Sequence, residues 1–181
     1  MCVNYPGYQI RSYRMALLMG ELYHKNLAMM DASALCYCWL LVNVTQPSYG
    51  WTRTLFVPDE SHGSVPTAGG YQLRVFGAYS RHVREGMVRI DAETADGDLL
   101  ATAFADDKGG QTVVLLNRGL APRMVQVKNT RHGFSAVERT DPYRENAVES
   151  SKLESGDKLA IEPGAVVTLS NVPLGRPSRE P

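Results

Sequence analysis

Pairs of carboxylates are the residues of this sequence whose type and spacing could perform acid and base chemistry. Two Asp or Glu side chains that flank a bond can act as proton donor and as base or nucleophile. The close pairs along the chain are Asp59 with Glu60, Asp91 with Glu93, Asp96 with Asp98, and Asp106 with Asp107. Three of the pairs lie in turns or in a polar loop, and Asp91 and Glu93 share one face of an expected strand beside Arg89. We therefore interpret them as solvated surface and turn charges, and assign no catalytic residue within the chain.

The cysteines and histidines form no metal-binding or nucleophile motif. Cys36 and Cys38 lie two residues apart on an expected strand and point to the same side, which supports neither a disulfide framework nor a four-ligand zinc site. We interpret both as small buried apolar residues. The histidines, at positions 24, 62, 82 and 132, are scattered, and lone surface residues explain them. We expect no metal and no cofactor.

The composition disfavours two classes of partner. The formal net charge is zero, so there is no electrostatic reason to expect binding to nucleic acid. The apolar run from Ala34 to Val42 is far shorter than the ~20 residues of a membrane-spanning helix, so we expect no membrane span. Residues 1–7 have neither the basic nor the apolar region of a secretory signal, and the localisation stays open.

The first half of the chain has the pattern of an α/β segment. Apolar residues at helical spacing predict an amphipathic helix over Arg11–Met30, and a run that is apolar on both faces predicts a buried strand over Ala34–Val42. A polar loop rich in Pro, Gly and Ser follows over 45–70. A second helix is expected over Tyr71–Val83, with Gly86 as its stop signal.

Beyond Gly86 the pattern changes to short β-rich runs separated by turn residues, which is typical of a β-sandwich. Turns are indicated by Asp-Gly, Asn-x-Gly and Pro-Gly combinations. Strands are expected near 87–95, 99–106, 112–117, 123–129, 134–140, 147–152, 158–162 and 165–171.

The order of these motifs resembles the end of glycoside hydrolase family 30, which contains glucosylceramidase-like, xylanase-like and endo-β-1,6-galactanase-like enzymes. Residues 77–90, GAYSRHVREGMVRI, are similar to the family phrase G-x-x-S-R-x-x-R-P-G-x-x-R-I at the junction of helix and sandwich. Glu85 stands where the family usually has proline. Residues 101–104, 112–117 and 164–169 are similar to strands of the family's sandwich.

The resemblance implies a fold class, an α/β remnant of a (β/α)₈ barrel followed by an all-β sandwich. Residues 1–86 then form the C-terminal segment of a TIM-barrel catalytic domain, with a helix, the eighth strand, a loop and the final helix. Residues 87–174 form an antiparallel β-sandwich and 175–181 a tail. The family's nucleophile and acid/base glutamates belong to the fourth and seventh barrel strands, so both are expected upstream of Met1. The chain alone is then an inactive fragment of a retaining O-glycoside hydrolase of β-linked glycans.

The resemblance also implies substrate-binding residues. Trp39 stands near the carboxyl end of the expected eighth strand, where its ring would face a sugar, and Tyr37 lies deeper on the same side. Tyr49 and Trp51 in the following loop, and Tyr5 near the start, are further candidates. A core Trp and a loop anchor are the structural alternatives for Trp39 and for the loop pair.

The partners implied are a β-linked glycan and the missing N-terminal barrel, and the parent enzyme is expected to be secreted or periplasmic. A different class of function, a non-catalytic carbohydrate-binding or structural β-sandwich module, is the alternative. An exposed row of aromatic residues on the sandwich strands would favour it.

Overall fold

The structure is a computed structural model of the 181-residue chain. It describes residues 2–3, 13–37, 56–59, 63–66, 71–130, 132–141, 147–149, 152–154 and 156–173. The chain divides into two compact units, Met1–Phe76 and Gly77–Pro181, and the division falls inside the second helix. The junction expected near Gly86 from the sequence lies further along the chain, and remains a prediction.

The first unit begins with a strand, a helix and a second strand. β1 (Cys2–Val3) pairs in parallel with β2 (Cys36–Tyr37), with Cys2 opposite Cys36 and Val3 opposite Tyr37. α1 (Tyr13–His24) lies between them in the sequence and continues as a π-helical segment, η1 (Lys25–Met29). A parallel pair requires a crossover connection, and α1 with η1 provides it.

The expected helix over Arg11–Met30 is confirmed between Tyr13 and Met29, with a change of helical type that periodicity does not reveal. Its buried stripe contains Met15, Ala16, Met19 and Tyr23. Asp31, at φ 50°, ends the helical path in a left-handed conformation that Asp tolerates.

The expected strand over Ala34–Val42 is present at Cys36–Tyr37, and Trp39 with the rest of that run lies outside the described residues. Cys36 is exposed, so our prediction of a buried side chain is wrong for this residue. The side chain of an edge position in a two-residue strand is not covered merely because its neighbours in sequence are apolar. Cys38 lies outside the described residues.

The loop expected over 45–70 contains a hairpin. β3 (Phe56–Asp59) pairs antiparallel with β4 (Gly63–Pro66), so the expectation of a loop is wrong in this part. Pro58 and Pro66 made the segment look like a loop. In a two-stranded ribbon both strands are edges, where a residue without an N–H is tolerated.

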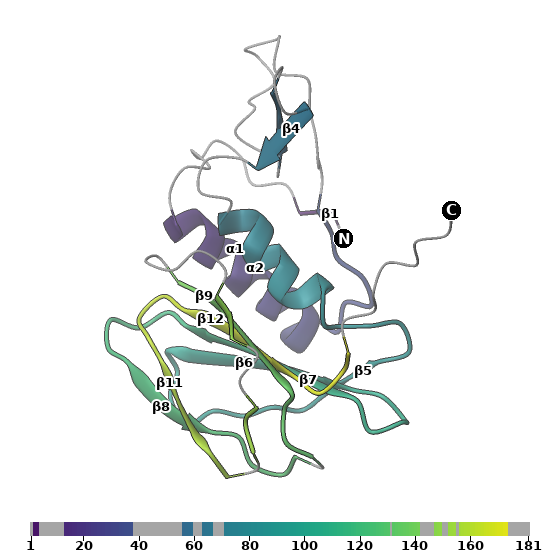
Figure 1. The fold of residues 1–181 in the computed structure, drawn as a ribbon, viewed down its shortest axis with the longest axis vertical. Helices are drawn as coiled ribbons and strands as arrows, with labels where there is room; N and C mark the ends of the chain where they lie inside the picture. Colours follow the sequence, from purple (N-terminus) through teal and green to yellow (C-terminus); the bar gives the residue numbers. More distant parts are fainter. Residues whose placement is uncertain are drawn as a thin grey trace. The chain divides into compact units, whose positions relative to one another are not determined.

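The second unit is an all-β unit of two sheets (Figure 1). The larger sheet has six strands in the order β10-β9-β12-β7-β6-β5, and the smaller sheet pairs β11 with β8. The strands are β5 (Val88–Ile90), β6 (Leu99–Ala105), β7 (Gln111–Asn117), β8 (Arg123–Gln126), β9 (Ala136–Thr140), β10 (Ala147–Glu149), β11 (Lys158–Ile161) and β12 (Val166–Ser170). Each falls within or next to a strand expected from the sequence. All printed pairings in the two sheets are antiparallel.

A hydrophobic core lies between the two sheets. Its members come from one face of the large sheet and from the small sheet with its flanking segments, and include Leu115, Phe134, Ile161, Val167 and Leu169. Partly buried Val125 and Leu159 of β8 and β11 pack against it. The β-sandwich expected from short β-rich runs separated by turn residues is therefore the architecture of this unit.

The six-stranded sheet is buried on its second face as well. Every residue of β7 and of β12 is buried, so alternation between core and solvent is absent from these central strands. α2 (Tyr71–Ser80) crosses from the first unit into the second, and within the second unit its last residues lie on this second face, where Ala78 is bound by Thr168. Gly86, at φ 83°, follows in a left-handed conformation and carries the chain from the helix to β5.

Candidate functional site

Of the five residues predicted to bind sugar, the structure describes Tyr37. The other four lie outside the described residues: Tyr5, Trp39, Tyr49 and Trp51. Its ring lies 6.0 Å from that of Phe76 on α2, at 57° between the planes. The Phe76 ring lies at the same distance from Tyr23 of α1, edge to face. Tyr37 therefore belongs to an aromatic cluster with Phe76 and Tyr23.

The segment that carries the family resemblance, residues 77–90, places a charge cluster at the end of α2. Arg81 Nη1 donates to Glu138 Oε1 at 2.8 Å, and His82 Nε2 lies 2.8 Å from Glu138 Oε2. The side chains of His82 and Glu138 are only 1% and 4% exposed. Our interpretation of His82 as a lone surface residue is therefore wrong. Glu138 lies on β9, 56 residues away, and nothing in the local sequence pairs the two.

Further hydrogen bonds tie the same helix end to the sheet. Thr168 Oγ1 of β12 donates to the carbonyl oxygen of Ala78 at 2.9 Å, and Thr112 Oγ1 of β7 donates to that of His82 at 3.0 Å. Burial raises the pKa of Tyr79 far above its usual value, although a hydrogen bond with Thr102 acts in the other direction. The last turn of α2 is thus fixed by three strands of the sheet and by full burial of Tyr79.

A carboxylate bound to both a histidine and an arginine is an arrangement that catalysis also uses. Here both oxygens of Glu138 lie within hydrogen-bond distance of protein nitrogens, and Arg81, His82 and Glu138 do not line the groove described below. The cluster can hold the helix against the sheet. It presents no reacting group to a substrate.

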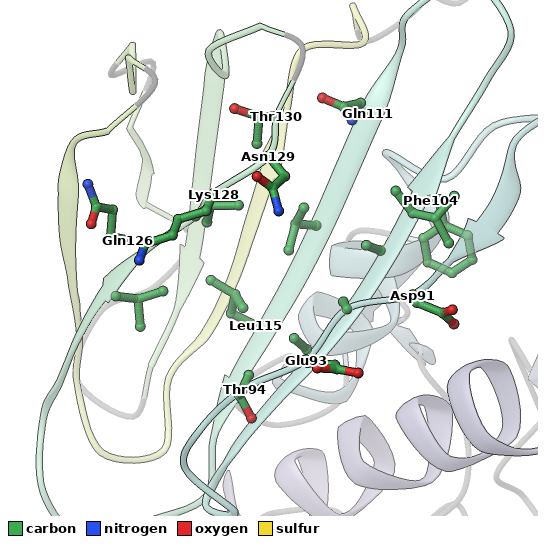
Figure 2. A pocket seen from close by; sticks show the side chains of 17 residues that line it. Asp91, Glu93, Thr94, Phe104, Gln111, Leu115, Gln126, Lys128, Asn129 and Thr130 are labelled. Atoms are coloured by element: carbon green, nitrogen blue, oxygen red, sulfur yellow. The ribbon is translucent and has the colours of Figure 1, made fainter.

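A groove of about 450 Å³ opens on the core face of the six-stranded sheet (Figure 2). Its floor is apolar, with Ala101, Ala103, Val113 and Leu115. One wall runs from the last residue of β5 over residues 90–94. The other runs from the end of β8 over residues 125–130. We call this the sandwich groove. Asp91 and Glu93 stand on one wall and Lys128 on the other, as Figure 2 shows.

The sandwich groove has little that would hold a sugar ring. Sugars are bound largely through aromatic faces, and the aromatic residues of the described part of the sandwich, Phe104 and Phe134, are both buried. The small sheet has two strands against six in the large one, which leaves this part of the core face uncovered. The groove is therefore an uncovered part of the core face, with an apolar floor and charged residues on its walls.

Asp91 and Asp96, which we expected to be surface and turn charges, form ion pairs and turn hydrogen bonds of that kind. Arg89 Nη1 donates to Asp91 Oδ1 at 2.9 Å, and the Asp91 side chain is 92% exposed. Asp96 accepts hydrogen bonds from the backbone N–H of Asp98 and from Arg123 Nε. These bonds hold the pKa of Asp96 below its usual value, so it stays ionised and is a poor proton donor.

Within the described residues, no group of three or more His, Cys, Asp or Glu side chains is placed to hold a metal ion. No helix among those described is both long and apolar enough to cross a bilayer.

The comparisons with known proteins concern the fold of the chain. No protein-family model matches the sequence, and no curated protein matches it either. Solved structures do match. A GH30 endoxylanase from Clostridium papyrosolvens C71 is 16% identical with a TM-score of 0.70, and the match covers 93% of this chain and 41% of that one.

Two other structures extend this comparison. The catalytic domain of GH30 xylanase C from Talaromyces cellulolyticus is 18% identical over 86% of this chain and 34% of its own, with a TM-score of 0.66. A β-porphyranase of family 86 from Bacteroides plebeius is 16% identical over 92% of this chain and 32% of its own, with a TM-score of 0.63.

The chain therefore has the fold of a C-terminal part of family 30 glycoside hydrolases, and it spans about two fifths of the first of these neighbours. The resemblance stated from residues 77–90 is confirmed at the level of fold. Because the family 86 enzyme shares that fold, the fold alone does not separate the two families.

Proposed function

We propose that this chain is the C-terminal part of a retaining O-glycoside hydrolase that acts on β-linked glycans. In this proposal the nucleophile and the acid/base glutamate belong to an N-terminal part of the barrel, and the chain alone does not cleave a glycosidic bond. The observation that carries the proposal is the match with GH30 xylanases over 93% of this chain but only 41% of the longer one.

The state of the acidic side chains supports the absence of catalysis. A retaining glycosidase needs two carboxylates about 5–5.5 Å apart that reach the scissile bond from a cleft. Glu138 is buried under Arg81 and His82, and Asp96 is engaged by Arg123. Asp91 is exposed and bound to Arg89. Each of these three carboxylates is thus bound to an arginine of the same chain.

The test is an assay of the purified full chain on aryl β-glycosides and on β-1,6-linked oligosaccharides. We expect no turnover, and we expect turnover when an N-terminal family 30 barrel segment with both glutamates is co-expressed. Hydrolysis by the chain alone, abolished by substitution of one of its own acidic residues, would contradict the proposal. An in-frame barrel with two strand-end glutamates encoded upstream of Met1 would support it.

We place sugar binding in the complemented enzyme at Trp39 and Tyr37, with Tyr49, Trp51 and Tyr5 as outer contacts. The position of Tyr37 beside Phe76 supports this, because a packed aromatic is held rigidly. Trp39→Ala should then raise KM at least about tenfold, since stacking on one sugar ring is lost. Phe134→Leu, in the sandwich core, is the matched control and should leave KM unchanged.

The N-terminal part is also the partner proposed for the sandwich. The sandwich groove leaves the core face open between residues 90–94 and 125–130, where a segment of the longer enzyme would complete the second sheet. Amide hydrogen exchange should show new protection in these two segments when the N-terminal part is added. Unchanged exchange there, with activity restored, would place the contact elsewhere.

A further inference from the structure

We propose that Cys2 and Cys36 form a redox modification site, at which a small disulfide compound oxidises the pair to a disulfide bond. The inference concerns the first unit and does not depend on the proposed function. β1 and β2 pair in parallel, and their register places Cys2 directly opposite Cys36. The sequence contains three cysteines, and this register selects one pair among them.

The spacing of paired strands brings opposite residues within the reach of a disulfide. Neighbouring strands lie about 4.7–4.9 Å apart, and the Cα atoms of bonded cysteines usually lie about 4.4–6.8 Å apart. Opposite residues of a pair of strands also share one face. The Cβ atoms of a disulfide are closer, at about 3.5–4.5 Å, so the strands must tilt slightly toward each other. A ladder of two residues in each strand offers little resistance to that tilt.

Cys36 is the residue at which the oxidant can react first, because a thiol must be accessible to the reagent. In the structure Cys36 is a free cysteine and is exposed. The next residue, Tyr37, belongs to the opposite face of β2 and contacts the ring of Phe76. The contact with α2 therefore covers the face of Tyr37, and leaves the face of Cys36 open to a reagent in solution.

The reaction is thiol–disulfide exchange in two steps. The thiolate of Cys36 attacks one sulfur of the small disulfide, which releases one thiolate and leaves its other half on Cys36 as a mixed disulfide. The thiolate of Cys2 then attacks Cys36 Sγ and displaces this second half as a thiolate. Both cysteines are oxidised, one oxidant molecule is reduced to two thiols, and these thiols take up the two cysteine protons.

The bond would join the two strands that lie on either side of α1 and η1 in the sequence. A parallel pair as short as β1 and β2 contributes little stability by itself. In the oxidised chain the covalent bond holds β1 beside β2, and in the reduced chain only the ladder does. The proposed site is thus a reversible clamp on the start of the first unit.

The experiment is oxidation of the dilute full chain with an excess of oxidised glutathione, followed by blocking of free thiols, digestion and mass spectrometry. We expect a bridged peptide pair that joins Cys2 to Cys36, and its loss after treatment with dithiothreitol. Cys2→Ser should abolish the bridge and leave a glutathione adduct on Cys36. Cys36→Ser should abolish the bridge as well. Cys38→Ser is the matched control, and should leave the bridge unchanged.

Oxidation of the natural chain in concentrated urea tests whether the register selects the pair. Nothing holds Cys2 opposite Cys36 in an unfolded chain, so the share of this bridge should fall there. An equal share in the folded and unfolded chains would overturn the proposal. A bridge between Cys36 and Cys38, bridges only between separate chains, or a lasting glutathione adduct on Cys36 of the natural chain without a bridge, would overturn it as well.

Discussion

At the scale of single residues, burial decides which charges matter to this fold. The chain has exposed ion pairs, such as Arg89 with Asp91, whose attraction is weakened by water. Glu138 differs because its side chain is almost out of contact with solvent and binds two partners from the end of α2. Removal of one partner from a buried group leaves the others uncompensated, which costs far more than the loss of a surface contact.

Glu138→Ala should therefore lower the free energy of unfolding by about 1–3 kcal/mol, because the buried His82 and the partly exposed Arg81 lose the carboxylate that they share. Arg118→Ala removes a partly exposed arginine 3.8 Å from Asp98, and should change it by less than about 1 kcal/mol. Urea unfolding followed by circular dichroism measures both. Equal small losses in the two variants would contradict a stabilising role for the buried cluster.

Asp96 makes stability depend on pH in the acidic range. The backbone N–H of Asp98, and then Arg123, hold the pKa of Asp96 below its usual value of 3.8. A carboxyl whose pKa is lower in the folded chain stabilises the fold above its unfolded-state pKa, and this contribution is lost as the pH falls through the folded-state pKa.

Asp96→Asn should therefore make the chain less stable at neutral pH and flatten the acidic part of the stability curve, so that the difference from the natural chain closes as the pH falls below about 5. The measurement is the urea midpoint at a series of pH values. Parallel curves for the two proteins would show that Asp96 does not cause the acid dependence.

At the scale of elements, the strands of the sandwich were predictable because each is bounded by strong turn chemistry. The turn at Glu162-Pro163-Gly164, where Gly164 has φ 74°, separates β11 from β12 as expected. The helices were predictable from their apolar stripes. The hairpin of β3 and β4 was not, because prolines normally exclude strands and are tolerated only at edges.

The contacts of the candidate site were less predictable than its elements. His82 stands near the end of the helix expected over Tyr71–Val83, and in the structure it follows that helix in a turn. A lone histidine there is interpreted as a surface residue, because nothing nearby in the sequence identifies its buried partner. Its partner Glu138 alternates along β9 like a solvent-facing residue. Only the pairing of β9 with β12, and the position of the helix end over that face, turn both inward.

Gly133 lies where the segment before β9 comes close to the backbone of Leu153. A Cβ at this position would lie 2.7 Å from the carbonyl oxygen of Leu153, next to the bridge between Phe134 and Leu153. Gly133→Ala should therefore lower the free energy of unfolding by about 1–3 kcal/mol, because backbone must move. Gly97→Ala meets no atom within 4 Å, and should change it by no more than about 0.5 kcal/mol. Thermal unfolding of both variants is the measurement. An unchanged stability in Gly133→Ala would mean that the two segments can move apart at little cost.

At the scale of the whole molecule, the two units differ in what holds each together. The hydrophobic core formed by Leu99 to Leu169 lies entirely within the second unit, and all of its strands are paired antiparallel. The described strands of the first unit are short, with two residues each in β1 and β2. A short parallel pair contributes little stability without neighbouring strands. The second unit therefore has the means to fold by itself, and α2 is the element that it shares with the first.

A fragment of residues 71–181, which keeps α2 whole, should fold without residues 1–70 and unfold in one cooperative transition. Its stability should come from the core between the sheets, so Leu115→Ala in the same fragment should lower the free energy of unfolding by about 2–5 kcal/mol. Far-UV circular dichroism during thermal and urea unfolding measures both proteins. A fragment that binds a hydrophobic dye and loses its signal gradually would contradict this prediction. In that case the sandwich requires residues of the first unit, or of the longer enzyme, before its sheets can pack.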